Sequence, residues 1–367
     1  ILEWIDDAQT LDAAWNEAAD DTEREHLIKL LVGHLASHHR SGITQQDMHL
    51  SNFLQSNGTI YSIDGDRVRA FKELGDSRAM HNLAQLLALL PLRMQRLVPD
   101  LFDAYRHARG EPVGDGTPEE ILGLTARVRR KLLRRHLKKM FRNCTAIRVD
   151  RLPPLQRSYL RQHDGTDLGK VLTPDFIDQP PADAKILKRG NSSTVWASEL
   201  NGCLCTFKRY NVKNALHGIK LALRESRALK SWRNAHRLGF HGINTLQPIA
   251  AILEKPFLFT RRAWFISDFV IGQDAADFFS FDRKMTDSEA LVARKICSLI
   301  VLMGRNRISH GDLKATNILI KDGEPCLIDL DALQEHPTHR RARRKVEKDQ
   351  RRFLANWRDS PVPVSYT

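Results

Sequence analysis

Acidic and amide side chains recur at fixed intervals in two segments of this chain. In residues 308–333, Asn317 follows Asp312 after five residues, and Asp329 follows Asp312 after seventeen. Residues 43–68 repeat these intervals 265 positions earlier, with Asp47, Asn52 and Asp64. Each copy also has an Asp-Gly or Asn-Gly pair before its last carboxylate, and such pairs favour the tight turn of a β-hairpin. The sequence therefore predicts a duplicated functional hairpin.

This set of side chains suits phosphoryl transfer from a nucleotide. The reaction needs a carboxylate that orients or deprotonates the accepting hydroxyl, and ligands that hold Mg²⁺ across the triphosphate. Asp312 on its loop suits the first task, and the hairpin would bring Asn317 and Asp329 together for the second. Lys314 is placed to neutralise charge on the moving phosphoryl group. In the first copy Asp47 takes the place of the base, and the matching metal ligands are Asn52 and Asp64.

The segment "HGDLKATN…LIDLD" resembles the catalytic loop and metal-binding motif of the protein-kinase-like superfamily. The resemblance implies an upstream lysine for the phosphates, held by a glutamate on a helix. Lys208 ends a predicted strand, and Glu225 lies on a helix predicted over about residues 214–236, in the expected order. "KRGNSSTVW" takes the place of the phosphate-covering loop, where we expect the backbone of Gly190 and Ser192 to reach a phosphate.

Two further segments, "FRNCTAIRV" and "GITQQDMHLSNFL…SIDGD", look like those of the bacterial lipopolysaccharide core kinases, the Kdo and heptose (WaaP-like) kinases. This resemblance implies ATP and Mg²⁺ as cofactors and a sugar hydroxyl of the lipopolysaccharide inner core as the acceptor. It also implies a cytoplasmic protein at the inner membrane. The expected partner is the lipopolysaccharide core or another anionic glycolipid, with peripheral membrane contact.

The charge of the chain agrees with an anionic partner. The 367 residues carry a formal net charge of +13, concentrated in the runs 127–142 and 339–352. Aromatic residues are not interleaved with these charges, so we expect no nucleic acid as a partner. The longest apolar runs are shorter than the roughly 18 residues that a membrane-spanning helix needs. The five cysteines are scattered and show no paired metal-binding spacing.

The repeat and the alternation of elements predict an α+β protein. We expect a protein-kinase-like bilobal fold, a small β-rich lobe plus a helical lobe, preceded by a second, mostly helical kinase-like C-lobe. The predicted boundaries are 1–149 for that first C-lobe, 150–182 for a Pro-, Asp- and Gly-rich linker, 183–270 for the β-rich lobe and 271–367 for the second C-lobe.

The two copies differ in completeness. No counterpart of Lys208 precedes the first copy. By comparison with the second copy, the chain would begin at the hinge between the two lobes of a kinase. We therefore interpret the chain as a fragment of a longer protein. Gln46 and His49 also replace Gly311 and Lys314. We therefore expect the second unit to be catalytic. The first unit is either also active in a complete protein or a pseudokinase that binds nucleotide or substrate without turnover. The alternatives are a kinase for proteins or for small molecules such as aminoglycosides, and a non-catalytic scaffold that binds an anionic surface.

Overall fold

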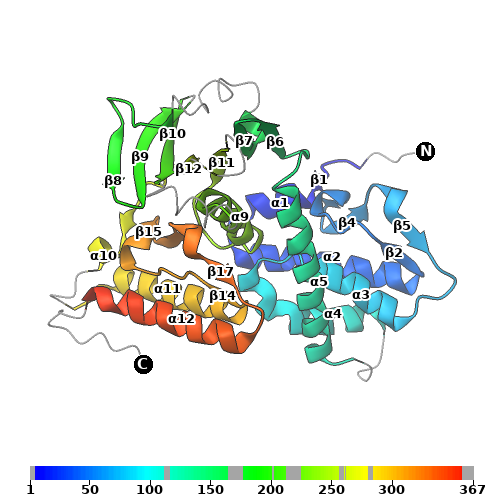
Figure 1. The fold of residues 1–367 in the computed structure, drawn as a ribbon. Helices are drawn as coiled ribbons and strands as arrows, with labels where there is room; N and C mark the ends of the chain where they lie inside the picture. Colours follow the sequence, from blue (N-terminus) through cyan, green and yellow to red (C-terminus); the bar gives the residue numbers. More distant parts are fainter. Residues whose placement is uncertain are drawn as a thin grey trace. The chain divides into compact units, whose positions relative to one another are not determined.

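A computed structural model describes the fold of most of the chain (Figure 1). The described residues are 5–110, 116–163, 177–200, 202–211, 225–255, 260, 262–279 and 284–357. The chain divides into two compact units, Ile1–Arg134 and Arg135–Thr367.

The first unit is mainly helical. Helix α2 (Asp21–Arg40) begins where the Asp20 carboxylate accepts hydrogen bonds from the backbone of the first turn, at 2.8 and 3.0 Å. Leu27, Leu31 and Leu35 on one face of α2 are buried in the core of the unit. The other helices are α1 (Leu11–Glu17), α3 (Asp76–Leu87), α4 (Val98–Arg109) and α5 (Pro118–Lys139), which continues into the second unit, with the 3-10 turns η1 (Leu50–Asn52), η2 (Gly65–Arg67) and η3 (Leu92–Leu97).

The first predicted hairpin lies in this unit. Strands β3 (Phe53–Ser56) and β4 (Thr59–Ser62) pair antiparallel, and β1 (Gln9–Thr10) adds to β3. A second ladder joins β2 (Ile43–Gln45) to β5 (Val68–Ala70), so the loop between β2 and β3 is fixed at both ends.

The second unit begins with an antiparallel sheet of seven strands, in the order β6-β7-β11-β12-β10-β9-β8. Trp196 and Phe207 stack at 5.5 Å between ring centroids in its core, and Trp264 is fully buried. Helix α9 (Arg227–Phe240) contacts β11 and β12. The strands are β6 (Ile147–Leu152), β7 (Leu155–Leu160), β8 (Lys185–Arg189), β9 (Ser193–Leu200), β10 (Cys203–Tyr210), β11 (Pro248–Glu254) and β12 (Arg262–Asp268), and the turn η4 (Arg161–His163) follows β7.

The prediction of a linker over 150–182 was wrong for its first part. Residues 147–160 form the hairpin β6–β7, and β7 pairs with β11 along five residues. Every residue of β11 is buried, so both of its backbone edges need a partner. Strand β12 pairs with one edge and β7 with the other. The prolines that suggested a linker, Pro153 and Pro154, lie in the turn between the two strands.

The helical part of the second unit carries the second hairpin, β15 (Ile318–Lys321) and β16 (Glu324–Leu327), next to β13 (Gln273–Asp274). Strand β14 (Ile308–Ser309) precedes the hairpin along the chain and strand β17 (Gln334–Glu335) follows it, and these two strands pair with each other. Helix α12 (His339–Leu354), the last α-helix in the described chain, contacts α11 (Asp287–Arg305) (Figure 1). The helices and turns are α10 (Ala275–Phe278), α11 (Asp287–Arg305), α12 (His339–Leu354), η5 (Ala315–Asn317), η6 (Leu330–Ala332) and η7 (Ala355–Trp357). The α+β class and the β-rich lobe followed by a helical lobe are confirmed.

The two hairpins share their unusual backbone conformations. Four pairs of residues, each 265 positions apart, have left-handed φ angles: Gly42 and Arg307 (73° and 60°), Asn57 and Asp322 (48° and 52°), Gly58 and Gly323 (74° and 72°), and Asp64 and Asp329 (60° and 57°). Most L-residues avoid this region, so its recurrence at matched positions is a property of the local fold rather than of composition. Gly311 departs from the match: its φ is 81°, whereas the corresponding Gln46 lies outside the left-handed region.

Candidate active site

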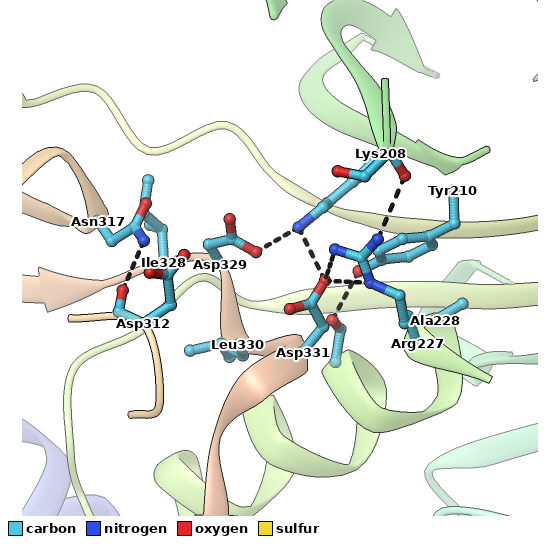
Figure 2. Close-up of polar contacts among 12 residues, drawn as sticks. Lys208, Tyr210, Arg227, Ala228, Asp312, Asn317, Ile328, Asp329, Leu330 and Asp331 are labelled. Atoms are coloured by element: carbon cyan, nitrogen blue, oxygen red, sulfur yellow. Dashed lines mark hydrogen bonds and ion pairs between the residues drawn. The ribbon is translucent and has the colours of Figure 1, made fainter. Parts of the chain in front are cut away.

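The second hairpin places the three predicted polar residues on adjoining loops. The side-chain amide Nδ2 of Asn317 donates to the backbone carbonyl of Asp312 at 2.8 Å (Figure 2). The backbone N–H of Ile328 donates to the carbonyl of Asn317 at 3.0 Å, which brings Asp329 beside the same loop. The hydrogen bond of Asn317 uses its nitrogen and leaves its amide oxygen, the atom that binds a cation, uninvolved in that contact.

Lys208 extends from the interior strand β10 toward these carboxylates. Its ammonium group forms an ion pair with Asp329 and lies 3.4 Å from the Oδ2 atom of Asp331 (Figure 2). Burial would lower the pKa of Lys208, but the two carboxylates raise it above its ordinary value. Burial would likewise raise the pKa of Asp329, but Lys208 lowers it below its ordinary value. Lys208 is thus held as a cation and Asp329 as an anion.

Asp331 joins three elements of the site. Its carboxylate accepts hydrogen bonds or ion pairs from Lys208 on β10 and from the Nε and Nη2 atoms of Arg227 on α9, at 2.9 and 2.6 Å. Arg227 also lies over the Tyr210 ring, 4.8 Å from its centroid, and donates to the carbonyl of Ser192 at 3.3 Å. Sequence reasoning missed Asp331 and Arg227, although a second aspartate two residues after Asp329 was a visible signal.

The expected pair between Lys208 and Glu225 does not form. Glu225 lies before α9, whose N-cap is Ser226, and it pairs with Arg233 two turns along the helix. The prediction placed Glu225 on the helix. The helix instead begins at Arg227, so an arginine occupies the position nearest the carboxylates, and Asp331 supplies the negative charge for Lys208. The other residues of the predicted helix, 214–224, lie outside the described residues.

Gly190 and Ser192 lie in the turn between β8 and β9. The N–H of Gly190 donates to the carbonyl of Ser193 at 3.0 Å, and the carbonyl of Ser192 accepts from Asn211 at 3.1 Å. These contacts fix the turn as part of the sheet. Lys188 and Ser193, on either side of it, line the pocket described next.

A pocket of about 330 Å³ lies between the sheet and the second hairpin. One side is apolar, which suits the base of a nucleotide. Lys208, Asn317 and Asp329 line its polar part, which suits a triphosphate with Mg²⁺. The end of strand β12 also contributes Asp268, and burial raises the pKa of that carboxyl. The apolar lining residues are Leu187, Val195, Leu246, Phe265, Phe269, Val270, Leu319 and Ile328.

Residues 187–358, which contain this pocket and its polar side chains, match the family model described as "Lipopolysaccharide kinase (Kdo/WaaP) family". The match extends over slightly less than half of the chain and relates this segment to the lipopolysaccharide kinases. A solved structure, "WaaP in complex with acyl carrier protein", is similar at 16% sequence identity and a TM-score of 0.35, over 49% of this chain and 80% of that chain. A search of the curated proteins finds no match.

Helix α12 holds the catalytic loop of the kinase unit. The buried carboxylate of Asp349 accepts hydrogen bonds from the backbone N–H groups of His310, at 2.7 Å, and Gly311, at 3.0 and 3.1 Å. Burial lowers the pKa of His310, whose Nε2 contacts the carbonyl of Ile328 at 2.9 Å. Neutral His310 therefore connects the catalytic loop to the strand that leads to Asp329.

Two cations lie next to Asp312. The Nη1 atom of Arg352, also on α12, is 2.7 Å from its Oδ1, and the ammonium of Lys314 is 3.8 Å from its Oδ2. Lys314 thus lies beside Asp312, the residue predicted from the sequence as the base. Arg352 was not singled out from the sequence, because it lay within a run of basic residues that indicated only general attraction to an anionic partner.

The residues of the first hairpin repeat part of this geometry. The amide of Asn52 donates to the carbonyl of Asp47 at 3.2 Å, as Asn317 does to Asp312. The N–H of Ile63 donates to the carbonyl of Asn52 at 2.9 Å, which places Asp64 as Asp329 is placed. Asp47 and Asp64 are exposed. His49, at the position of Lys314, contacts Ser51 at 2.5 Å.

Proposed function

We propose that this protein is an ATP-dependent kinase that transfers a phosphoryl group to a sugar hydroxyl of the lipopolysaccharide inner core. The observation that carries the proposal is the convergence of Lys208, Asn317 and Asp329 in the pocket with Asp312 on the adjoining loop. The family of residues 187–358 supports the choice of acceptor.

Each residue has a part in the transfer. Lys208 would bind the phosphates, and Asp331 and Arg227 would hold Lys208 in place. The acceptor oxygen bonds to the γ-phosphorus while the bond from that phosphorus to the bridging oxygen breaks, and ADP leaves. Asp312 orients the hydroxyl and takes its proton. Mg²⁺, held by Asn317 and Asp329, would offset negative charge on the phosphates.

The first unit would serve as a pseudokinase that supports the second. Its hairpin repeats the left-handed residues and the Asn-to-Asp hydrogen bond of the kinase unit, which supports a common origin of the two. Gln46 in place of Gly311 gives its loop a different backbone. Asp47, Asn52 and Asp64 would then bind a ligand without turnover, or keep the shape of the hairpin.

The acceptor is proposed to be an anionic glycolipid, reached from the cytoplasm at the inner membrane. The net charge of +13 supports attraction to such a surface. In the part of the chain that the structure describes, no helix has both the length and the apolar character needed to cross a bilayer. Contact with the membrane would therefore be peripheral for the described helices.

The test is transfer of labelled γ-phosphate from Mg-ATP to dephosphorylated lipopolysaccharide core. We expect Asp312→Asn to lower the rate by about 10²- to 10⁴-fold, in the range of a lost general base, without loss of nucleotide binding. Asp47→Asn is the matched variant in the first unit and should transfer label at the wild-type rate. Loss of transfer in Asp47→Asn alone would reverse the assignment of the two units. Nucleotide binding without labelled core in any form would contradict the proposed acceptor.

A further inference from the structure

Helix α12 has one buried face and one strongly basic face. Its buried positions are Ala342, Val346, Asp349 and Phe353, spaced three or four residues apart. The exposed positions carry eight basic side chains: Arg340, Arg341, Arg343, Arg344, Lys345, Lys348, Arg351 and Arg352. The last of these contacts the proposed base, so the basic face ends at the point of reaction.

The contact between Arg352 and Asp312 is an ion pair that can exchange. The two side chains are 42% and 30% exposed, so the pair stays in contact with solvent. The covered Oδ1 atom of Asp312, which is 2.7 Å from Arg352, receives no hydrogen bond from any residue that the structure describes. Arg352 donates instead toward the carbonyl of Gly311, at the long distance of 3.4 Å. Breaking this pair therefore costs little in hydrogen bonding.

The ion pair covers one of the two carboxylate oxygens of Asp312, and a second cation, Lys314, lies beside the other. A hydroxyl that donates its proton to Asp312 must approach this carboxylate, and Arg352 then requires another anion. We propose that Arg352 binds an anionic group, a carboxylate or a phosphate, carried by the acceptor next to its reacting hydroxyl. Binding of that group draws Arg352 away from Asp312, so that the Asp312 carboxylate can accept a hydrogen bond from the acceptor hydroxyl. The inference rests on the proposed function and defines the chemistry of its acceptor.

The guanidinium group suits this exchange. It can donate two parallel hydrogen bonds to a carboxylate or a phosphate, which Lys314 cannot do. The other basic residues of α12 attract a polyanionic molecule to the same end of the helix. An acceptor without the anionic group leaves Arg352 on Asp312, and the enzyme discriminates against it. Arg352 is thus a specificity-determining residue.

The experiment compares acceptors that differ in the charge of one group beside the hydroxyl. Truncated core acceptors carry the same accepting sugar with a free carboxylate, with its methyl ester, or with a phosphate beside the hydroxyl. Wild-type enzyme should prefer the charged acceptors in kcat/KM by about 10- to 100-fold, the effect of one hydrogen-bonded charge. Arg352→Gln should lose this preference and keep the wild-type KM for ATP. Arg351→Gln, which removes an equal charge from the neighbouring exposed position, should keep the preference.

Three results would overturn the inference. An equal loss on charged and neutral acceptors in Arg352→Gln would show that Arg352 does not read the acceptor. A raised KM for ATP would assign Arg352 to the nucleotide instead. An identical loss of preference in Arg351→Gln would mean that the preference for charged acceptors comes only from general attraction by the basic face of α12. Failure of wild-type enzyme to label any of the acceptors is a separate outcome, which would remove the proposed function and this inference with it.

Discussion

The carboxylate of Asp349 holds the backbone N–H of Gly311 with both oxygens, at 3.0 and 3.1 Å. Gly311 immediately precedes Asp312, so this contact sets the position of the proposed base from a helix 38 residues later in the chain. An aspartate on a buried helix face is costly unless it is hydrogen-bonded, and here the loop supplies the donors.

Replacing Asp349 should therefore slow phosphoryl transfer. Asp349→Asn weakens charge-assisted bonds, and we expect kcat to fall about tenfold with an unchanged KM for ATP, because Asp349 does not line the pocket. Glu347→Gln, which removes an exposed partner of Arg343 on the same helix, should have no effect. Steady-state kinetics on both variants measures the difference. A rise in the KM for ATP with unchanged kcat would argue against a role in placing the base.

A side chain at position 311 should disturb the same loop. Gly311 has φ of 81°, and a Cβ atom there would lie 2.5 Å from the carbonyl oxygen of Ala332. Gly323, in the hairpin turn, has φ of 72° but no atom within 4 Å of a Cβ. Both substitutions by alanine carry the backbone cost, of about 1 kcal/mol, and only Gly311→Ala adds the clash. We expect Gly311→Ala to have the lower urea midpoint and the lower kcat. Equal midpoints would mean that the loop can move away from Ala332.

Asp331, rather than Glu225, should control binding of the nucleotide phosphates. Asp331→Asn leaves Lys208 and Arg227 with one fewer negative partner, and we expect kcat/KM for ATP to fall about 10- to 100-fold. Glu225→Gln removes only the pair with Arg233 and should stay within about twofold. Titration with ATP, by binding and by kinetics, gives both values. A larger effect of Glu225→Gln would restore the pair predicted from the sequence.

The first unit should lose stability in mild acid because of buried histidines. His39, between Tyr105 and Asn82, has its pKa lowered to about 4 by burial, against an unfolded value of 6.5. Below pH 6.5 the unfolded chain takes up a proton that the folded unit does not. Stability is therefore complete above pH 6.5 and falls as the pH approaches 4, by up to about 3 kcal/mol for this group.

Urea unfolding of the full chain at pH 7 and pH 5 tests this sign. The wild-type midpoint should be lower at pH 5, and His39→Gln should reduce that difference. His26→Gln, which replaces an exposed histidine of the same helix, should keep it. An unchanged pH dependence in His39→Gln would show that other groups control the acid sensitivity.

The sequence intervals predicted the local geometry of the site well. Asn317 follows Asp312 at a distance along the chain that a short loop spans, and the Asp-Gly turn returns the strand to Asp329. These contacts form between residues that are close in the sequence, so the spacing alone is enough to predict them. The resemblance to kinases also predicted a lysine upstream of the hairpin, and Lys208 lies beside Asp329.

Contacts between distant elements were harder to predict. The partner of Lys208 depends on where α9 begins, and the capping of that helix by Ser226 moved Glu225 out of it. The hairpin β6–β7 is part of the sheet because β7 pairs with the buried strand β11, which lies about 90 residues later in the chain. For Asp349 a signal existed: it shares the helical spacing of Ala342, Val346 and Phe353, which marks it as a buried residue among basic ones.

Helix α12 has a practical consequence for how this kinase can be handled. A fragment that stops after the second hairpin, at residue 336, would keep every residue of the metal-binding motif and yet lack the carboxylate that braces the catalytic loop. A protease cut within the exposed basic face of α12 would separate Asp349 and Arg352 from the loop they contact. A shortened form that is meant to keep these contacts must therefore extend through Phe353, and trimming the basic end as a disposable tail would remove both residues from the site.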